Sequence, residues 1–181
     1  MEKTQRVFTA LRFDDTSIER IEEIQRRIGT LGLHGVPIPG SALHSTLYFL
    51  GNSDTKTCLA ADQIAKDTSK TVTGLHLTAD RITLFERARC LVLILKKEPA
   101  LEESWRQHIE RLRAAAIIQT DQPLLYTPHI TLFRRVKLVD RTILDIPVSQ
   151  LPLTVKDAVL YESILGMDKP TYLPWKDPSP R

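Results

Sequence analysis

The chain has 181 residues, of which 42% are hydrophobic and 26% are charged. This composition is ordinary for a globular protein and excludes intrinsic disorder as the default state. The formal net charge of +3 suits an anionic substrate, but it is too small to indicate nucleic-acid binding by itself.

Cysteine usage and apolar patterning bear on the compartment. The two cysteines, Cys58 and Cys90, make neither a disulfide framework nor a metal cluster, as is usual for reduced cysteines of a cytosolic protein. The first residues lack the apolar region of a signal peptide, and no apolar run approaches the roughly 20 residues of a membrane span. We therefore expect a cytoplasmic protein that does not enter the membrane.

The first half of the chain predicts two strands and two helices. Residues 6–13 are rich in β-branched and aromatic side chains, which is typical of a strand. A helix follows, because four isoleucines recur near one helical face and Thr16 with Glu19 has the spacing of a capping box. After a Gly- and Pro-rich loop, residues 43–50 predict the second strand. The second helix is expected over about residues 55–66, because the segment after it is polar and β-branched.

The second half of the chain contains one clear helix among several strands. Pro99 opens this helix, whose apolar stripe includes Leu101, Trp105 and Leu112, with Arg106 off the stripe. The predicted strands cover residues 74–79, 81–85, 90–96, 127–136, 150–155, 158–165 and 172–175.

A coarse internal repeat relates the two halves. Each half offers a helix with an apolar stripe, a loop, and then a strand that begins with His-x-Thr-Leu. No internal linker is long enough to separate independent domains. We therefore expect one bilobal domain over residues 1–181, of the α+β class, with two pseudo-symmetric lobes that each have an antiparallel sheet backed by helices.

The two His-x-Thr strands are the most informative segments. One contains His44 and Thr46, and the other contains His129 and Thr131. Because side chains alternate across a strand, each His and Thr share one face while the residue between them points to the core. A single histidine of this kind is usually structural, but two copies in matching contexts favour a functional pair. If the lobes pack about a pseudo-twofold axis, the two imidazoles lie on opposite sides of one small group, in a groove between the lobes.

Such a pair suits the hydrolysis of a cyclic phosphodiester. One neutral imidazole takes a proton from water, and one protonated imidazole gives a proton to the departing ribose oxygen. An imidazole pKa of about 6.5 permits both roles near neutrality. The hydroxyls of Thr46 and Thr131 donate to the non-bridging phosphate oxygens. This division of labour requires no metal and no cofactor.

The three other histidines are expected to lie outside the site. His76 begins a third His-x-Thr, but it lacks the following Leu-aromatic pair and the helix and loop that lead into the other two. His34 falls in the Gly- and Pro-rich loop, and His108 is expected on the polar side of its helix.

The two motifs with their flanks resemble the 2H phosphoesterase superfamily, and within it the bacterial 2'-5' RNA ligase branch, whose members act as RNA 2',3'-cyclic phosphodiesterases. The resemblance covers nearly the whole chain, from the opening RVFTAL through LHSTLYFLG and PHITLFR to LYES and TYLPW. It implies a bilobal fold and hydrolysis of a terminal 2',3'-cyclic phosphate to a 2'-phosphomonoester. It further implies that His44 is the proton donor, that His129 is the proton acceptor, and that Thr46 and Thr131 bind the phosphate.

The resemblance also implies a phosphate-binding role for Arg134 and a base contact by Phe49. Strict strand alternation disagrees, because it places Tyr48, Phe133 and Arg135 on the groove side instead. A bulge or a strong twist at the strand end would reconcile the two. We favour Arg134 over Arg135 for the phosphate, and keep both Phe49 and Tyr48 as base-stacking candidates.

Several alternatives stay open at this point. The same site could act on a small nucleotide cyclic phosphate or run in reverse as a 2'-5' ligase. A non-catalytic RNA-binding module would use the same groove without needing two imidazoles. A metallohydrolase would need three or four close ligands, whereas each motif histidine has hydroxyl and apolar neighbours. We expect RNA or a cyclic nucleotide as the partner, and a monomer without metal.

Overall fold

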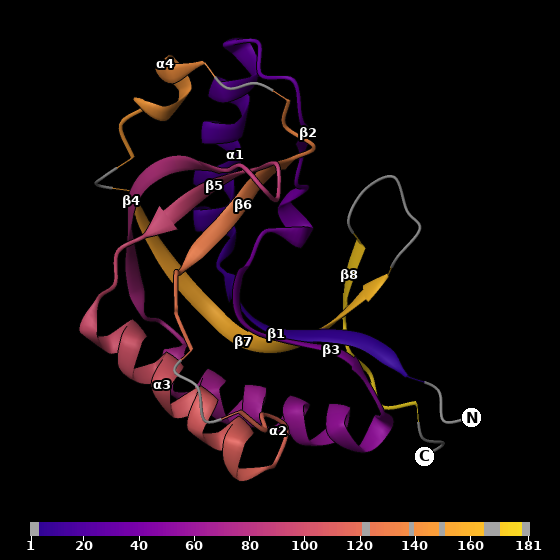
Figure 1. Cartoon of the computed structure of the whole chain (residues 1–181). Helices are drawn as coiled ribbons and strands as arrows, with labels where there is room; N and C mark the ends of the chain where they lie inside the picture. Colours follow the sequence, from indigo (N-terminus) through magenta and orange to yellow (C-terminus); the bar gives the residue numbers. More distant parts are fainter. Residues whose placement is uncertain (1–3, 121–123, 138–139, 149–150, 165–170, 179–181) are drawn as a thin grey trace.

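The computed structural model describes residues 4–120, 124–137, 140–148, 151–164 and 171–178. Figure 1 shows antiparallel strands in two groups, with the helices on their outer sides. In chain order, the strands are β1 (Gln5–Phe13), β2 (Val36–Pro37), β3 (Ser45–Ser53), β4 (His76–Phe85), β5 (Cys90–Leu95), β6 (His129–Arg134), β7 (Pro152–Ile164) and β8 (Thr171–Pro174). The helices are α1 (Asp15–Thr30), α2 (Thr55–Val72), α3 (Pro99–Ala114) and the short α4 (Arg141–Leu144), with a 3₁₀ turn at Gly40–Ala42.

The strands are hydrogen-bonded in the order β1-β3-β6-β5-β4-β7-β8. The first lobe contains β1, β3, β8 and the end of β7; α2 packs on β1 and β7, and α3 packs on α2 and β3. The second lobe contains β2, β4, β5 and β6, with α1 beside β6. In Figure 1, α2 and α3 lie below the first lobe, whereas α1 and α4 lie at the opposite end. This two-lobed α+β arrangement confirms the fold class predicted from the sequence.

Two strand pairings join the lobes among the described residues. β3 and β6 share the pair Ser45–Ile130. His76–Thr78 at the start of β4 pairs with residues 152–154 of β7. β7 then continues into the first lobe, where residues 155–162 pair with β1. The two strands that carry the His-x-Thr motifs are therefore direct neighbours across the lobe boundary.

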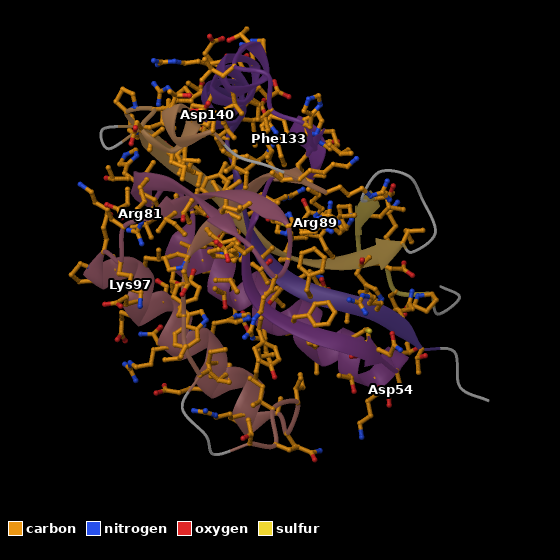
Figure 2. The ribbon with its side chains drawn as sticks, turned by 45° about the horizontal axis from the view of Figure 1, so that its top comes forward. Asp54, Arg81, Arg89, Lys97, Phe133 and Asp140 are labelled. Carbon is orange, nitrogen blue, oxygen red and sulfur yellow. The ribbon has the colours of Figure 1, made fainter. Side chains whose placement is uncertain are left out.

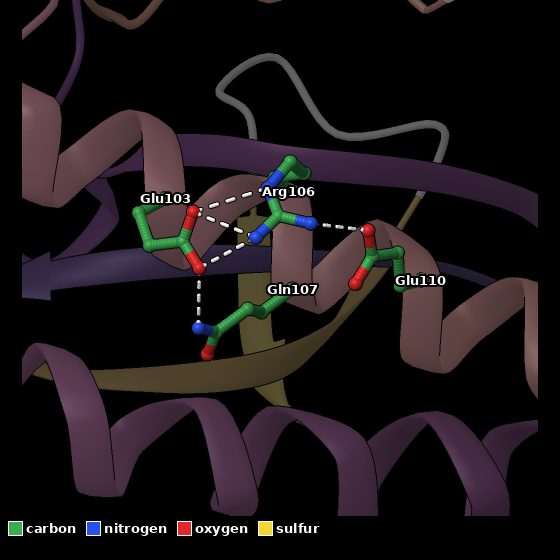
Figure 3. Close-up of polar contacts among 4 residues, drawn as sticks. All are labelled: Glu103, Arg106, Gln107 and Glu110. Carbon is green, nitrogen blue, oxygen red and sulfur yellow. Dashed lines mark hydrogen bonds and ion pairs between the residues drawn. The ribbon is translucent and has the colours of Figure 1, made fainter.

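The apolar stripes predicted for α1 and α3 face the interior. Ile21, Ile24 and Ile28 of α1 are at most 9% exposed, and Leu101 and Leu112 of α3 are fully buried. On the opposite side of α3, Arg106 bonds to the carboxylates of both Glu103 and Glu110, and Gln107 also donates to Glu103 (Figure 3). Because its charge is matched by two carboxylates, Arg106 offers little positive charge to an anionic ligand.

Two helix boundaries differ from the sequence prediction. The side chain that caps α1 is Asp14, which accepts from the Ser17 backbone N–H at 2.8 Å, and not Thr16. α2 extends to Val72, six residues further than expected from its composition. Its polar end is compatible with a helix because the Thr68 hydroxyl donates to the Ile64 carbonyl at 2.9 Å and Val72 is fully buried. No helix among the described residues is both long and apolar enough to cross a bilayer.

Several predicted strands merge. The predicted segments 74–79 and 81–85 merge into the single strand β4, which begins at His76 and has a register shift between Ala79 and Arg81. Segments 150–155 and 158–165 form β7, although Gln150 and Leu165 themselves lie outside the described residues. The predicted pairing of the 172–175 segment is confirmed by β8, which lies along β7. The short elements β2 and α4 carried no sequence signal and were missed.

The prediction that His108 lies on the polar side of its helix was wrong, because this side chain is completely buried. Its Nε2 lies 2.8 Å from the Thr9 hydroxyl of β1, and its Nδ1 lies 2.8 Å from the Thr68 hydroxyl of α2. Since Thr68 gives its own proton to Ile64, it accepts from Nδ1–H, and Nε2 accepts from Thr9. Burial lowers the pKa of His108 to about 4. His108 is therefore a neutral structural residue that links α3 to α2 and β1.

The assignment of Asp14 as the N-terminal cap of α1 can be tested by mutation. Replacing Asp14 by Ala should lower the free energy of unfolding by about 0.5–2 kcal/mol, because the Ser17 N–H loses its acceptor. The Ser17 hydrogen bonds lower the pKa of Asp14, so this difference should be present above the usual carboxylate pKa and should shrink as the pH falls through the lowered value. The measurement is urea unfolding at several pH values. Thr16→Ala, at an exposed position, is the matched control and should stay within about 0.5 kcal/mol of the wild type.

Candidate active site

The pair Ser45–Ile130 fixes how the two motifs meet. Both side chains are fully buried, so they point to the core side of the sheet. In an antiparallel register the neighbours of this pair lie on the opposite face, with His44 beside Thr131 and Thr46 beside His129. Each histidine thus stands next to the threonine of the other motif, in a reciprocal arrangement about a local twofold axis. We call the side of β3 and β6 that carries these four residues the motif face.

The two imidazoles are held in the same way. Nδ1 of His44 lies 2.7 Å from the carbonyl oxygen of Ala42, and Nδ1 of His129 lies 2.7 Å from that of Thr127. A carbonyl can only accept, so Nδ1 carries the hydrogen in both rings. In each case the acceptor is two residues before the histidine. Nε2 of each neutral ring is therefore left with its lone pair for proton transfer.

Each motif strand contains a bulge three residues after its histidine. In the pairing of β1 with β3, Ala10 faces Thr46 and Thr9 faces Tyr48, which leaves Leu47 as the extra residue. In the pairing of β5 with β6, Val92 faces Thr131 and Leu91 faces Phe133, so that Leu132 is extra. A bulge of this kind reverses the alternation of all side chains that follow it.

Helical side chains satisfy the carbonyl of each bulged residue. The Trp105 indole of α3 donates to the Leu47 carbonyl at 3.1 Å. The Leu132 carbonyl accepts from the Gln25 amide of α1 at 2.8 Å and from the Ile38 N–H at 2.9 Å. These donors compensate for the ladder bonds that a bulge disrupts, and α1 and α3 each support the bulge of the other half's motif strand.

The bulge in β3 places the two aromatic candidates on different faces of the strand. Phe49 faces Phe8, whose ring lies 5.0 Å from that of His44, so Phe49 is on the motif face and is 47% exposed. Tyr48 faces Thr9, which points toward α2 and α3, and packs against the apolar cluster between these helices. The alternation that placed Tyr48 on the motif face was wrong, because the bulge lies between Thr46 and Tyr48.

The bulge in β6 likewise determines which of the two arginines, Arg134 or Arg135, points to the motif face. Phe133 (labelled in Figure 2) faces Leu91 and belongs to the core, at 4% exposure. Arg134, the next residue, therefore points to the motif face, as the resemblance implied and strict alternation denied. Arg135 follows with a φ of 55° and is exposed.

Aromatic rings surround His44. The ring centroids of Phe8, Tyr161 and Tyr172 lie 5.0, 5.9 and 5.1 Å from its own. Burial among them lowers the pKa of His44 to about 4, against the opposing effect of the Ala42 carbonyl, and the positive charges of Arg134 and His129 lower it further. His44 is thus neutral at pH 7 in the unliganded protein. His129 has a single aromatic neighbour among the described residues, Phe85, at 5.0 Å.

Arg134 is held at one end only. Its Nη2 donates to the Tyr172 hydroxyl at 2.5 Å. Its Nε is buried and has no hydrogen-bond partner among the described residues. A buried guanidinium nitrogen without an acceptor is costly, so the bond to the Tyr172 hydroxyl matters for how this guanidinium is held.

A hollow of about 290 Å³ opens from the motif face along the first lobe. Its lining includes Thr46, His129, Tyr48, Phe49 and Leu125. Leu125 is 97% exposed, and the Phe49 ring lies under the Arg6 guanidinium at 4.6 Å. An apolar hollow that begins beside an imidazole suits the base of a nucleotide whose phosphate lies between the histidines.

The remaining histidines are not brought to the motif face. His76 is exposed at the first position of β4, where its Nδ1 lies 3.2 Å from the Thr154 hydroxyl. His34 lies in the loop before β2, and His108 is buried between the helices and β1. No group of three or more His, Cys, Asp or Glu side chains with the spacing of metal ligands occurs in the part of the chain that the structure describes.

Sequence reasoning missed the contribution of Phe8, Tyr161 and Tyr172 to the surroundings of His44. Tyr161 and Tyr172 lie in the LYES and TYLPW segments that carry part of the family resemblance, and Phe8 lies in the opening strand. That resemblance attached no role to them. Their positions near His44 depend on β1, β7 and β8 lying side by side.

Comparison with known proteins finds the fold among solved structures. No family model and no curated protein matches the sequence. The structure of Escherichia coli LigT with ATP is 26% identical, covers 96% of each chain and superposes with a TM-score of 0.70. The same protein with 3'-AMP gives 24% identity, 96% coverage of each chain and a TM-score of 0.72. The protein TT0787 of Thermus thermophilus is 22% identical over 94% of this chain and 95% of its own, with a TM-score of 0.63.

The solved structures match nearly the full length of the chain, and the two His-x-Thr strands lie side by side as the sequence resemblance requires. The chain thus has the two-lobed fold of Escherichia coli LigT and is similar to it over nearly its full length.

Proposed function

We propose that the protein hydrolyses the 2',3'-cyclic phosphate at the end of an RNA by acid–base catalysis with His44 and His129. The observation that carries this proposal is the reciprocal placement of the two His–Thr pairs about Ser45–Ile130. It offers two imidazoles at opposite corners of one site, with a threonine hydroxyl beside each.

The reaction requires one proton acceptor and one proton donor. His129 takes a proton from the attacking water, whose oxygen bonds to phosphorus. The bond from phosphorus to the ribose 3' oxygen breaks, and His44 gives that oxygen its proton. The products are a 3'-hydroxyl and a 2'-phosphomonoester. No covalent intermediate is formed.

The donor role of His44 depends on the substrate. The ring is neutral at pH 7 in the free protein, because burial lowers its pKa to about 4. A bound phosphate places negative charge beside the imidazole, which favours the imidazolium and raises the pKa. Binding of the anionic substrate therefore favours the protonated form of His44, and His44 is the residue that protonates the leaving group.

Hydrogen-bond donors on the motif face suit the phosphate. Thr46 and Thr131 supply hydroxyls to the non-bridging oxygens, where negative charge builds up in the transition state. Arg134 adds a guanidinium whose Nε has no partner among the described residues. Both Phe49 and Tyr48 line the hollow. Phe49 is the better candidate for base stacking because it is exposed on the motif face, whereas Tyr48 also packs against the apolar cluster between α2 and α3.

The ligands of the matched structures support a nucleotide phosphate as the bound group. LigT of Escherichia coli has been crystallised with 3'-AMP, with ATP and with NADP+. Each of these ligands carries phosphate on a nucleoside. In this chain, the motif face offers groups that suit a phosphate, and the hollow beside it offers apolar side chains that suit a base.

The first prediction concerns the reaction itself. A short RNA with a 2',3'-cyclic end should be opened to a 2'-phosphate, and turnover should persist in EDTA, because proton transfer and fixed hydrogen bonds activate the water. ³¹P NMR of the product identifies the phosphorylated position. A 3'-phosphate product would overturn the donor and acceptor assignment, and a loss of turnover in EDTA that zinc or magnesium restores would overturn the two-histidine mechanism. Parallel rates on 2',3'-cyclic AMP show whether the RNA chain contributes.

The second prediction concerns pH. Because the pKa of His44 is about 4 in the free protein, protonation of both imidazoles occurs only near that pH, so the acidic limb of kcat/KM should lie near pH 4. His44→Ala and His129→Ala should each reduce the rate by roughly 10²–10⁴-fold, and His44→Ala should move the acidic limb away from pH 4. The double variant should be little slower than either single one.

His76→Ala is the control for this pH profile, since His76 is exposed and lies away from the motif face. It should leave both limbs unchanged. If the rate loss of the His44/His129 double variant equals the product of the two single losses, a concerted transfer is contradicted and an RNA-binding module is favoured.

The third prediction tests the bulge in β6. Arg134→Ala should raise KM for the cyclic phosphate more than it lowers kcat, because the guanidinium holds the ground-state anion. Arg135→Ala, at the adjacent exposed position, should leave both constants within about twofold. Steady-state kinetics on 2',3'-cyclic AMP measures both. A larger effect from Arg135 than from Arg134 would show that the side chains alternate without the bulge.

A further inference from the structure

Tyr172 of β8 contacts two residues of the proposed site that come from different lobes. β8 lies along β7, with Tyr172 opposite Ser163. The hydroxyl of Tyr172 accepts from Arg134 at 2.5 Å, and its ring lies 5.1 Å from that of His44 at an angle of 89°. One side chain therefore joins the anion-binding arginine of the second lobe to the proton donor of the first.

The contact with Arg134 has a defined direction. A guanidinium has no acceptor, so the Tyr172 oxygen takes the N–H and keeps its own proton. Burial raises the pKa of Tyr172 despite the nearby Arg134 charge, so the phenol remains protonated at neutral pH. The Arg134 carbon Cζ also lies 5.8 Å from the centre of the Tyr172 ring. Since Nε of Arg134 has no partner among the described residues, Tyr172 supplies the hydrogen bond that orients this guanidinium.

The ring of Tyr172 has a separate role. Its edge-on contact with His44 is accompanied by an edge-on contact with Phe8 at 5.1 Å. Together with Phe8 and Tyr161, it covers part of the imidazole. Removing the hydroxyl and removing the ring should therefore have different consequences.

We propose that Tyr172 is a positioning residue that orients Arg134 through its hydroxyl and encloses His44 with its ring. The inference rests on the proposed function of these two residues. Phosphate affinity then depends on the hydroxyl, whereas the protonation of His44 depends on the ring.

The experiment compares Tyr172→Phe and Tyr172→Leu, alone and with Arg134→Ala. Kd for inorganic phosphate is measured by calorimetry, and KM, kcat and the pH profile are measured on 2',3'-cyclic AMP. Tyr172→Phe should raise Kd and KM about 5- to 20-fold, with kcat within about twofold, because one hydrogen bond to a charged group is lost. In the Arg134→Ala background it should add less than about twofold. Tyr172→Leu should raise KM equally and also move the acidic limb upward from pH 4.

Leu173→Ala is the control for damage to β8, because Leu173 is 52% exposed and adjacent to Tyr172. It should leave Kd and the pH profile unchanged. The proposal is overturned if Tyr172→Phe binds phosphate as the wild type does, or if its full effect persists without Arg134. It is likewise overturned if Tyr172→Leu, shown to be folded by its Tm, keeps the acidic limb at pH 4.

The phosphate-binding measurement separates this proposal from the proposed function. If the wild type binds phosphate in a Tyr172-dependent manner but does not open the cyclic substrate, the catalytic function fails while the role of Tyr172 stands. If the wild type turns over the substrate and Tyr172→Phe changes neither Kd nor KM, only the inference fails. A wild type that neither binds phosphate nor acts on the cyclic substrate would overturn both.

Discussion

The register of β3 against β6 is the constraint on which the site depends. Ser45 and Ile130 pair across the lobe boundary with both side chains in the core, which leaves His44 and His129 on the other face beside the threonines of the opposite motif. A shift of one residue would turn all four groups into the core, because side chains alternate with a period of two. The buried contacts of the two lobes therefore fix the register, and the register positions the two histidines proposed for catalysis.

The two bulges shift the alternation of the side chains that follow each motif, and so change which of them reach the motif face. They occur at equivalent places, Leu47 and Leu132, and bring Phe49 and Arg134, each five residues after a histidine, to the same face as the motif. The disrupted carbonyls are satisfied from the helices, by Trp105 and by Gln25. The same pseudo-symmetric framework thus places an apolar ring on one strand and a cation on the other, as a nucleotide with a base and a phosphate requires.

The charges at the site make it sensitive to the presence of an anion. Burial among aromatic rings lowers the pKa of His44 to about 4, and the nearby guanidinium of Arg134 lowers it further. Burial disfavours the charged form until a negative group arrives, whose attraction reverses the balance. In the proposed mechanism, the site holds its donor neutral when empty and favours the charged form when phosphate binds, which couples recognition of the anion to proton transfer.

The sequence by itself determined the lobed α+β class, the stripe of α1 and the two His-x-Thr strands, because these follow from local periodicity and from motif spacing. It did not determine that α2 continues to Val72, since the burial of Thr68 and its contact with His108 depend on α3. Nor did it determine which side chains follow the motifs onto the site. A bulge is a relation between two strands, and the position of Tyr172 beside both His44 and Arg134 is a relation among three. Only the tertiary structure decides such relations, because the partners that satisfy each bulged carbonyl and each buried guanidinium come from distant parts of the chain.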